Sequence, residues 1–396
     1  MVQPALLHKT PQQQTSTRLV ELDWLRVFVF GLLILYHVGM LYAENWDWHY
    51  KSNYSSKFLS NIMLWSNQWR MSLLFMISGA AVSFLLLHQA WWRVALQRVP
   101  ILLLPLIFGM LVVVVPQVYV EFNSKGIINS PDYWHFWNAY LDQTSPEFSN
   151  HKTLGSMQLT WNHLWFLPYL LAYTLIVSAA YPLLSNPKLL PFWQFIARNT
   201  PMLAVVLVPI LVSYVIGFLL DDRYPVTYNF VQDWFNHARS FLVFVIGFAL
   251  VRMPLIWSRF SSLRWHFLSI ATCTFVYILF SYNGGSLGDS FPAKIIKSLF
   301  WTANGWFWML ALIGWAQHWF HKSNPTLRYL NRGVYCFYIV HQTLIIVIAY
   351  FLVPQNLGGF WEPTLIVLFV FIGCVLMFEV IRRLPVLPIF FGIRRR

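Results

Sequence analysis

The sequence predicts an all-α polytopic membrane protein with about ten transmembrane helices and both termini in the cytoplasm. Hydrophobic residues make up 58% of the 396 residues and charged residues only 10%, whereas a soluble domain carries about 25% charged residues. The hydrophobic residues also form continuous runs of about 20 residues, the length that an α-helix needs to cross a bilayer. An outer-membrane barrel would show short alternating segments instead.

The expected spans follow one another along the chain. They are residues 21–43, 58–87, 99–121, 161–184, 201–220, 237–257, 264–282, 293–317, 333–353 and 362–383. Pro100, Pro105 and Pro116 predict a kink in the third span, because proline cannot donate the backbone hydrogen bond of a helix. Asn304 and Gly305 interrupt the eighth, which has the weakest apolar pattern.

The positions of the basic residues indicate the orientation of the protein in the membrane. With the N-terminus in the cytoplasm, 17 of the 27 Lys and Arg residues fall in cytoplasmic segments and 7 in outer segments, and such a bias is typical of cytoplasmic loops. We therefore expect a disordered cytoplasmic tail at 1–17, a transmembrane domain over 18–385 and a basic cytoplasmic tail at 386–396. The basic residues are scattered between apolar runs, so the net charge of +13 does not indicate a nucleic-acid partner.

The outer segments are acidic and aromatic. Eleven of the 14 Asp and Glu residues fall outside, and the longest outer segment, about 122–160, is rich in Trp, Tyr, Asn and Asp. Such residues suit stacking on sugars and hydrogen bonding to them. An ordinary interfacial aromatic belt with a solvated loop would have the same composition. The three cysteines, Cys273, Cys336 and Cys374, have no metal-ligand spacing, so we expect no disulfide framework and no metal site.

The first span carries ionisable residues on one face. Arg26 and His37 are 11 residues apart, which returns the helix to within about 20° of its starting direction after about 16 Å. Asp23 lies within about 60° of the same stripe. Each such residue costs roughly 2.5–3.5 kcal/mol at the centre of a membrane helix, so the stripe indicates a polar passage. A snorkelling Asp23–Arg26 pair and an interhelical hydrogen bond from His37 would be the structural alternative.

Other spans add polar residues at a similar depth. Arg70 lies about 12 residues into the second span, near mid-bilayer, and needs a partner such as Glu44 or a hydrated cavity. His341 lies near the centre of the ninth span. His163 opens the fourth span near the outer surface, where an interfacial role is the simpler interpretation. Together these residues favour a membrane-embedded site, although a proton-coupled transporter would use similar groups.

Four motifs now resemble a known family. The Arg26–His37 spacing, with "LDWLR" before it, "RMSLLFMISG" in the second span, "HLWFLPYLL" in the fourth and "YCFYIVHQ" in the ninth are similar, in this order, to motifs of the acyltransferase 3 family of integral membrane enzymes. The resemblance covers roughly 20–385. Within that family, "WWRVALQRVPILLLP" and "PQVYVEF" are most similar to the type that acts as a glucan succinyltransferase.

The resemblance implies a reaction and roles for residues. The enzyme would move a succinyl or acetyl group from cytoplasmic succinyl-CoA or acetyl-CoA to a hydroxyl of an extracytoplasmic glycan such as a periplasmic glucan, with no bound cofactor and no metal. It implies His37 as the general base, Arg26 at the CoA phosphates and Arg70 at the acyl group or oxyanion. We also expect four residues to line the substrate site: Asp23, Glu44, His163 and His341.

The implied setting is the cell inner membrane, with the lipid bilayer, the acyl-CoA, the glycan acceptor and glycan-synthesis proteins as partners and no nucleic acid. Two other functions stay open from the residues alone. One is a proton-coupled transporter or flippase for a glycan or an organic anion, and the other is a scaffold within a polysaccharide-export complex. The sequence does not choose between a succinyl and an acetyl group.

Overall fold

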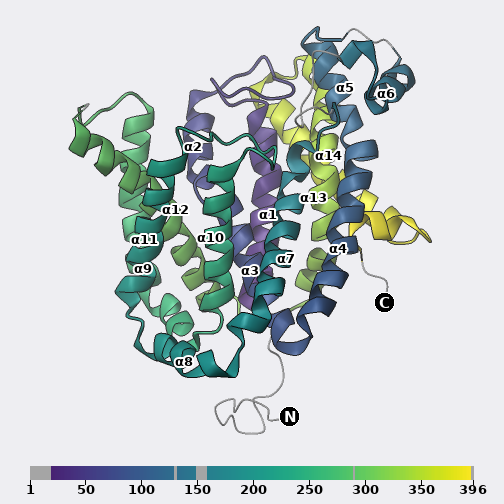
Figure 1. Ribbon diagram of the computed structural model, residues 1–396. Helices are drawn as coiled ribbons and strands as arrows, with labels where there is room; N and C mark the ends of the chain where they lie inside the picture. Colours follow the sequence, from purple (N-terminus) through teal and green to yellow (C-terminus); the bar gives the residue numbers. More distant parts are fainter. Residues whose placement is uncertain (1–18, 129–131, 149–157, 289, 394–396) are drawn as a thin grey trace.

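The protein is a bundle of α-helices joined by loops (Figure 1). The computed structural model describes residues 19–128, 132–148, 158–288 and 290–393. Within these ranges the only strand-like pairing is one isolated bridge between Ala43 and Ser56. The all-α prediction is therefore confirmed.

Eight helical segments in the described part of the chain are long and apolar enough to cross a membrane. They are Val20–Met40, Lys57–His88, Trp91–Ser124, Asn162–Leu184, Met202–Leu220, Pro254–Tyr282, Pro325–Gln355 and Gly358–Ile381. The other two expected spans are also helices, but they meet these criteria less well. Helix α10 (Trp234–Leu250) is apolar and has 17 residues, and α12 (Phe291–Trp319) carries Lys294 and Lys297 in its first turns.

Two of the expected spans are not continuous helices. The second divides into α2 (Lys57–Asn67) and α3 (Arg70–His88), so Arg70 begins a helix instead of lying within one. The third divides into α4 (Trp91–Phe108), a π-helical turn and α5 (Val115–Ser124), in which Pro116 occupies the first turn. A proline at the start of a helix leaves no intrahelical bond unmade, which accounts for a break at this position.

The remaining helices complete the bundle. They are α1 (Val20–Met40), α6 (Tyr133–Leu141), α7 (Phe166–Leu184), α8 (Leu190–Asn199), α9 (Met202–Leu220), α11 (Pro254–Tyr282), α13 (Pro325–Leu352) and α14 (Gly358–Ile381).

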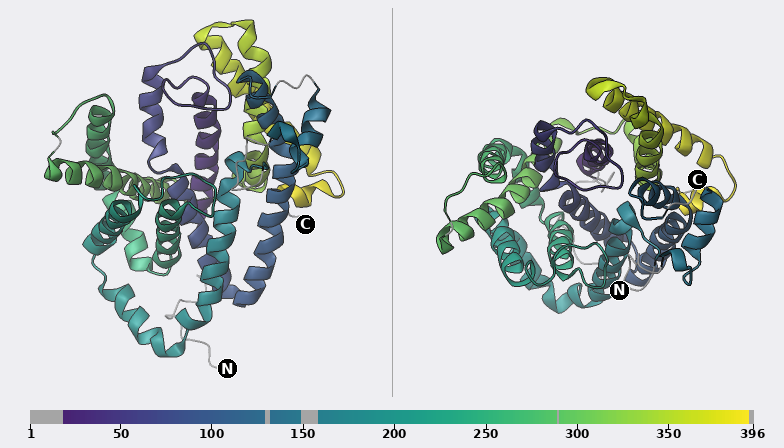
Figure 2. Two further views of the ribbon diagram at one scale, coloured as in Figure 1. Left: turned by 45° about the horizontal axis from the view of Figure 1, so that its top comes forward. Right: turned by 90° about the horizontal axis from the view of Figure 1, so that it is seen from above.

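Helix α1 lies in the middle of the bundle. It contacts α2, α3, α12, α13 and α14, and the view from above shows helices on several sides of it (Figure 2). Its apolar residues Val29 and Leu33 are buried in the core. Helix α1 therefore packs against other helices on several sides.

Helices α3 and α10 approach each other closely. A Cβ atom at Gly79 of α3 would clash with the backbone of Phe244, and one at Gly247 of α10 would clash with the backbone of Met76. Small residues at such crossings allow two membrane helices to pack through their backbones. This contact fixes α3, and with it the position of Arg70.

Two outlying segments pack against the bundle. In the long outer segment, α6 contributes Phe136, which packs with Phe122 and Phe148, so these aromatic rings form a small core of their own; residues 149–157 lie outside the described ranges. After α14, part of the expected basic tail is ordered, because residues 387–391 form a 3₁₀-helix in which Phe390 stacks on Phe108 at 5.0 Å between ring centroids. The expected tail at 1–17 and residues 394–396 also lie outside the described ranges.

Candidate active site

The structure brings two histidines from opposite ends of the chain together. The Nδ1 atom of His37 on α1 lies 2.8 Å from the Nε2 atom of His341 on α13. Their rings are stacked, with centroids 5.0 Å apart and an angle of 6° between the planes. His341 is fully buried, whereas His37 is partly exposed.

The hydrogen bonds of the neutral imidazoles fix their tautomers. The carbonyl oxygen of Tyr338 lies 2.7 Å from His341 Nδ1, and because a carbonyl can only accept, Nδ1 of His341 carries the proton. The Nε2 atom of neutral His341 then accepts from His37 Nδ1–H. The lone pair of His37 is thereby placed on Nε2, which is the state that a general base requires.

His163 also joins this group, and the interfacial position expected for it is wrong. Its Nε2 atom donates to the carbonyl oxygen of Ile339 at 3.0 Å, and its ring lies edge-on to His341 with centroids 5.0 Å apart. The side chain of Gln117 lies 3.4 Å from its Nδ1 atom. His163 is 6% exposed, so it packs behind His341 and does not face solvent.

Arg70 lies beside the segment of α1 that carries His37. Its guanidinium sits over the ring of Tyr36, 3.5 Å from the ring centroid. Arg70 is 5% exposed, and its Nε and Nη1 atoms have no hydrogen-bond partner among the described residues. A buried cation without an anion is costly, so this position suits a ligand that brings negative charge or a carbonyl oxygen.

The expected pairing of Arg70 with Glu44 is not formed. Within the described ranges Arg70 makes no ion pair. The backbone oxygen of Glu44 accepts a hydrogen bond from the hydroxyl of Ser60. Because α1 ends at Met40, Glu44 belongs to the outer loop. Arg70 instead contacts Tyr36, one turn before the end of α1.

Asp23 and Arg26 line a separate cavity at the other end of α1. Their side chains approach to 3.5 Å, which is the Asp23–Arg26 pair expected as the structural alternative to a polar passage. The cavity has a volume of about 670 Å³, within the range of about 300–1,000 Å³ that is typical of ligand pockets. His88, Arg98 and Asn331 add polar groups to its wall. From the charge bias of the sequence, we expect this end of the bundle to face the cytoplasm.

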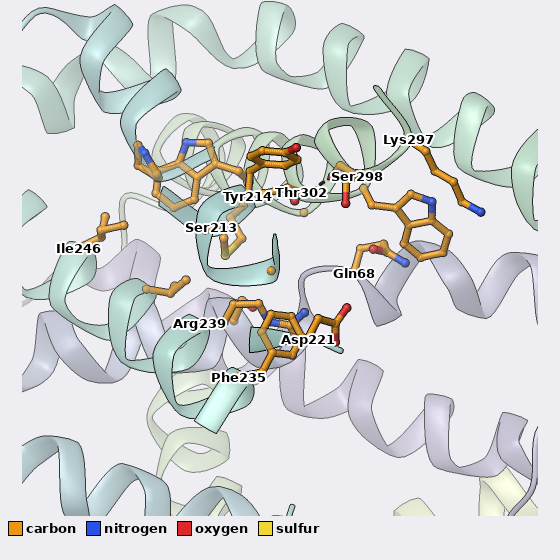
Figure 3. Close-up of a pocket in the computed structure, with 18 of the residues that line it drawn as sticks. Gln68, Ser213, Tyr214, Asp221, Phe235, Arg239, Ile246, Lys297, Ser298 and Thr302 are labelled. Carbon is orange, nitrogen blue, oxygen red and sulfur yellow. Dashed lines mark hydrogen bonds between the residues drawn. The ribbon is translucent and has the colours of Figure 1, made fainter. Parts of the chain in front are cut away.

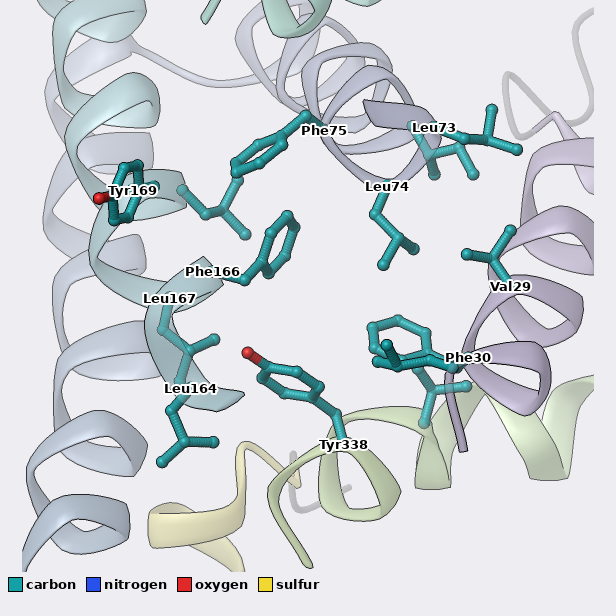
Figure 4. Close-up of a cluster of buried hydrophobic side chains, with 14 of the residues drawn as sticks. Val29, Phe30, Leu73, Leu74, Phe75, Leu164, Phe166, Leu167, Tyr169 and Tyr338 are labelled. Atoms are coloured by element: carbon teal, nitrogen blue, oxygen red, sulfur yellow. The ribbon is translucent and has the colours of Figure 1, made fainter. Parts of the chain in front are cut away.

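Three aromatic rings separate this cavity from the histidine pair. Phe30, Phe166 and Tyr338 line the cavity and converge from α1, α7 and α13 (Figure 4). The ring of Tyr338 lies 5.6 Å from that of Phe30 and 6.3 Å from that of Phe166, between centroids. Since the carbonyl of Tyr338 holds His341, the wall of the cavity is directly connected to the histidine pair.

On the opposite side, the loop between α1 and α2, residues 41–56, covers His37. The Trp48 ring lies against that of His37, with centroids 6.2 Å apart. Lys51 Nζ holds the loop by donating to the carbonyl oxygens of Met40 and Ala43. We call this segment the outer strap.

The outer strap is also fixed to other helices. His49 contacts the carboxylate of Glu121 on α5. The buried carboxylate of Glu362 on α14 accepts from Tyr42 Oη at 3.0 Å and from Ser52 Oγ at 2.6 Å. Burial and the neighbouring carboxylate raise the pKa of Tyr42, so its hydroxyl stays a donor at neutral pH.

The sequence did not single out Tyr36, Trp48, His49 or Glu121 as parts of this site. Trp48 and His49 occur in a loop, where no helical spacing indicates direction, and their neighbours are far away in the chain. The only signals were the position of Tyr36 beside His37 and that of Glu121 in the "PQVYVEF" motif.

Comparisons with known proteins identify the family of the chain. Residues 19–379 match the model of a family described as an acyltransferase domain. The chain is 22% identical over 383 residues to the glucans biosynthesis protein C of Escherichia coli K12, covering 94% of this chain and 93% of the relative. The proteins of the same name from Escherichia coli O157:H7 and Shigella dysenteriae serotype 1 are also 22% identical, with the same coverage. No solved structure matches.

The matched region contains α1, α3 and α13, which supply His37, Arg70 and His341, and the 3₁₀ turn before α7 that carries His163. It spans far more than half of the chain. The chain therefore belongs to the acyltransferase 3 family and is a multi-pass membrane acyltransferase.

Proposed function

We propose that the protein transfers an acyl group from cytoplasmic acyl-CoA to a hydroxyl of a glycan on the other side of the inner membrane. The observation that carries this proposal is the arrangement along α1. A cavity with Arg26 and Arg98 lies at one end, the His37–His341 pair lies between, and the aromatic outer strap lies at the other end. This arrangement supports a donor and an acceptor that arrive from opposite sides.

His37 acts as the general base. Its Nε2 atom takes the proton of the acceptor hydroxyl while the hydroxyl oxygen attacks the thioester carbonyl. The tetrahedral intermediate then collapses, the C–S bond breaks, and the CoA thiolate leaves and takes up that proton from His37. Positive charge on the His37 ring is stabilised by His341, which Tyr338 holds in the accepting tautomer.

Arg70 stabilises negative charge that forms beside His37. Two of its N–H groups have no acceptor within the described part of the chain, and they suit the oxyanion or a carboxylate on the acyl group. Because Arg70 is the first residue of α3, the positive end of the helix dipole adds to its charge.

The cavity of about 670 Å³ accepts the donor. Arg26, Arg98 and His88 are placed to attract the phosphates of CoA, and the pantetheine arm extends towards Tyr338. Rotation of the Phe30 side chain is needed to admit the thioester to His37, because the Phe30 and Tyr338 rings are in contact.

The acceptor binds beneath the outer strap. Trp48 and Tyr36 flank His37, and such rings stack on the apolar faces of sugars. The printed name of the relatives, glucans biosynthesis protein C, supports a glucan as the acceptor. A succinyl group is favoured over acetyl by the unpaired N–H groups of Arg70, which its free carboxylate would satisfy.

Mass spectrometry of cell-envelope glycans tests the proposal. Cells would carry the wild-type chain or His37→Ala at equal membrane levels. Loss of a succinyl or acetyl substituent in the variant would support acyl transfer and identify the group. If His37→Ala left the glycans unchanged, His37 would have no role in the chemistry. Loss of glycan export without loss of substituents would favour the transporter or flippase.

A further inference from the structure

A second cavity lies apart from the histidine pair, between α3, α9, α10 and α12. Its volume is about 380 Å³. Arg239 of α10 and Lys294 and Lys297 of α12 line it, together with Asp221 at the end of α9 (Figure 3). These charged residues come from the ends of the helices on the side that the charge bias assigns to the exterior. The acyl-transfer mechanism uses none of them.

The basic side chains in this cavity lack anionic partners. Among the described residues, the side chains of Arg239, Lys294 and Lys297 have no hydrogen bond to an acceptor and no ion pair. Arg239 lies only over the ring of Phe235, 5.4 Å from its centroid. Asp221 is the one carboxylate of the lining, so the cavity carries two uncompensated positive charges.

Two buried indole N–H groups of the lining are also unsatisfied. The Nε1 atoms of Trp301 and Trp306 are buried and have no acceptor in the described part of the chain. Trp306 is 4% exposed, so its N–H group does not reach bulk water. A buried donor without an acceptor is costly. Several donors and cations in one cavity therefore point to a ligand with several anionic oxygens, such as a phosphate.

The deeper wall of the cavity is apolar. It is formed by Val243 and Ile246 of α10 and Met309 of α12. Met309 is 12 residues beyond Lys297 on α12, or about 18 Å along the helix axis. The neighbouring helix α9 exposes apolar residues, with Leu211 at 53% and Phe218 at 68% exposure, as a lipid-facing helix does.

We propose that this cavity binds an anionic glycerophospholipid. Its phosphate lies among Arg239, Lys294 and Lys297, and one acyl chain extends along Ile246 and Met309. The charged end and the apolar end of the cavity match the two parts of such a lipid, whereas a free phosphate or a sugar would use only the charged end. This inference does not depend on the proposed acyl transfer.

Binding of a fluorescent phosphatidylglycerol to the purified full-length protein tests the proposal, with phosphatidylcholine as the zwitterionic comparison. The double variant Arg239→Gln/Lys297→Gln removes two cations and is expected to weaken phosphatidylglycerol binding about fivefold for each charge. Lys57→Gln removes an exposed outer cation away from the cavity and is expected to change nothing.

A third variant tests the volume of the cavity instead of its charge. A Cβ atom at Gly217, which lines the cavity, would meet nothing within 4 Å, so Gly217→Leu fills the cavity and leaves the cations in place. It is expected to weaken phosphatidylglycerol binding as well. If gel filtration and circular dichroism show that the double variant does not fold, the single variants Lys297→Gln and Gly217→Leu test the proposal in its place.

Three results would overturn the proposal. Equal affinity for phosphatidylglycerol and phosphatidylcholine would mean that the cations do not select the ligand. Unchanged binding in both the charge variants and Gly217→Leu would place the lipid elsewhere. Displacement of the lipid by glycerol 3-phosphate or by a soluble glucan at the same affinity would assign the cavity to a free phosphate or to a glycan.

Discussion

At the scale of single residues, the site depends on which nitrogen of each histidine carries a proton. The carbonyl of Tyr338 fixes His341, and His341 fixes His37. Arg70 is held beside them by the ring of Tyr36 and not by a carboxylate. The residues of the candidate site are therefore ordered by contacts between neighbouring helices before any substrate arrives.

The histidine pair is predicted to act as one unit. His341→Ala should lower kcat by at least about tenfold with little change in the KM for acyl-CoA, since it removes the acceptor of His37 Nδ1–H. His37→Ala should lower kcat about 100- to 10,000-fold, as loss of a general base does. Steady-state kinetics on purified protein measure both.

The double variant provides the control. Groups that act together are not additive, so His37→Ala/His341→Ala should be no slower than His37→Ala. If the two losses multiplied instead, His341 would have a role of its own.

Replacement of Arg70 is predicted to maintain or raise the stability of the fold and to lower the activity. Arg70→Met removes a buried cation without an ion pair and should leave the fold as stable or up to about 1–4 kcal/mol more stable, with a higher melting temperature. The same variant should lose about 100- to 1,000-fold in kcat, as removal of an oxyanion donor does. Thermal unfolding in detergent and an acyl-transfer assay check the two effects. A less stable but fully active variant would contradict both.

At the scale of the elements, the packing of α3 against α10 positions the site. The break between α2 and α3 places Arg70 at a helix start, and the glycines at the crossing set how near α10 comes. The outer strap acts from the other side, where Lys51, Glu362 and Glu121 hold it to α1, α14 and α5.

The crossing of α3 and α10 is predicted to tolerate no side chain. Gly79→Ala places a Cβ atom against the backbone at Phe244 and should destabilise the protein by about 1–3 kcal/mol, the usual cost of overpacking. Gly31→Ala is the matched control, because a Cβ atom there meets nothing within 4 Å. Thermal unfolding compares the two variants. Equal melting temperatures would show that α3 and α10 can move apart without a loss of stability.

At the scale of the whole molecule, two cavities with basic residues lie on opposite sides of the bundle centre. One is at the start of α1 and α4, and the other lies towards the outer ends of α9, α10 and α12. Helices α6 and α8 mark the two ends of the bundle (Figure 1). The proposed direction of acyl transfer requires that the end with α8 faces the cytoplasm.

This orientation is predicted to appear in cysteine labelling of whole cells. In a background with Cys273, Cys336 and Cys374 replaced by serine, Lys57→Cys should react with a membrane-impermeant maleimide. Lys188→Cys, just before α8, should react only after the membrane is permeabilised. The reverse pattern would place the donor cavity outside and contradict a cytoplasmic donor.

Several features could be read from the sequence because they depend on short-range patterns. Apolar runs of the length of a bilayer predicted the helices, and the 11-residue spacing of Arg26 and His37 predicted that these two side chains share one face of α1. The breaks at Gln68–Trp69 and near Gly109 were less visible, since a hydrophobic run looks the same whether its helix is continuous or divided.

The sequence by itself determined the membrane class, the all-α fold and the spacing of the polar residues on α1, because a periodic helix converts spacing into direction. Only the tertiary structure decided that His341 meets His37, that His163 is buried behind them and that Arg70 has no carboxylate partner. These contacts join residues up to 304 positions apart. They are set by how helices pack against one another, a property of the whole chain that no local pattern records.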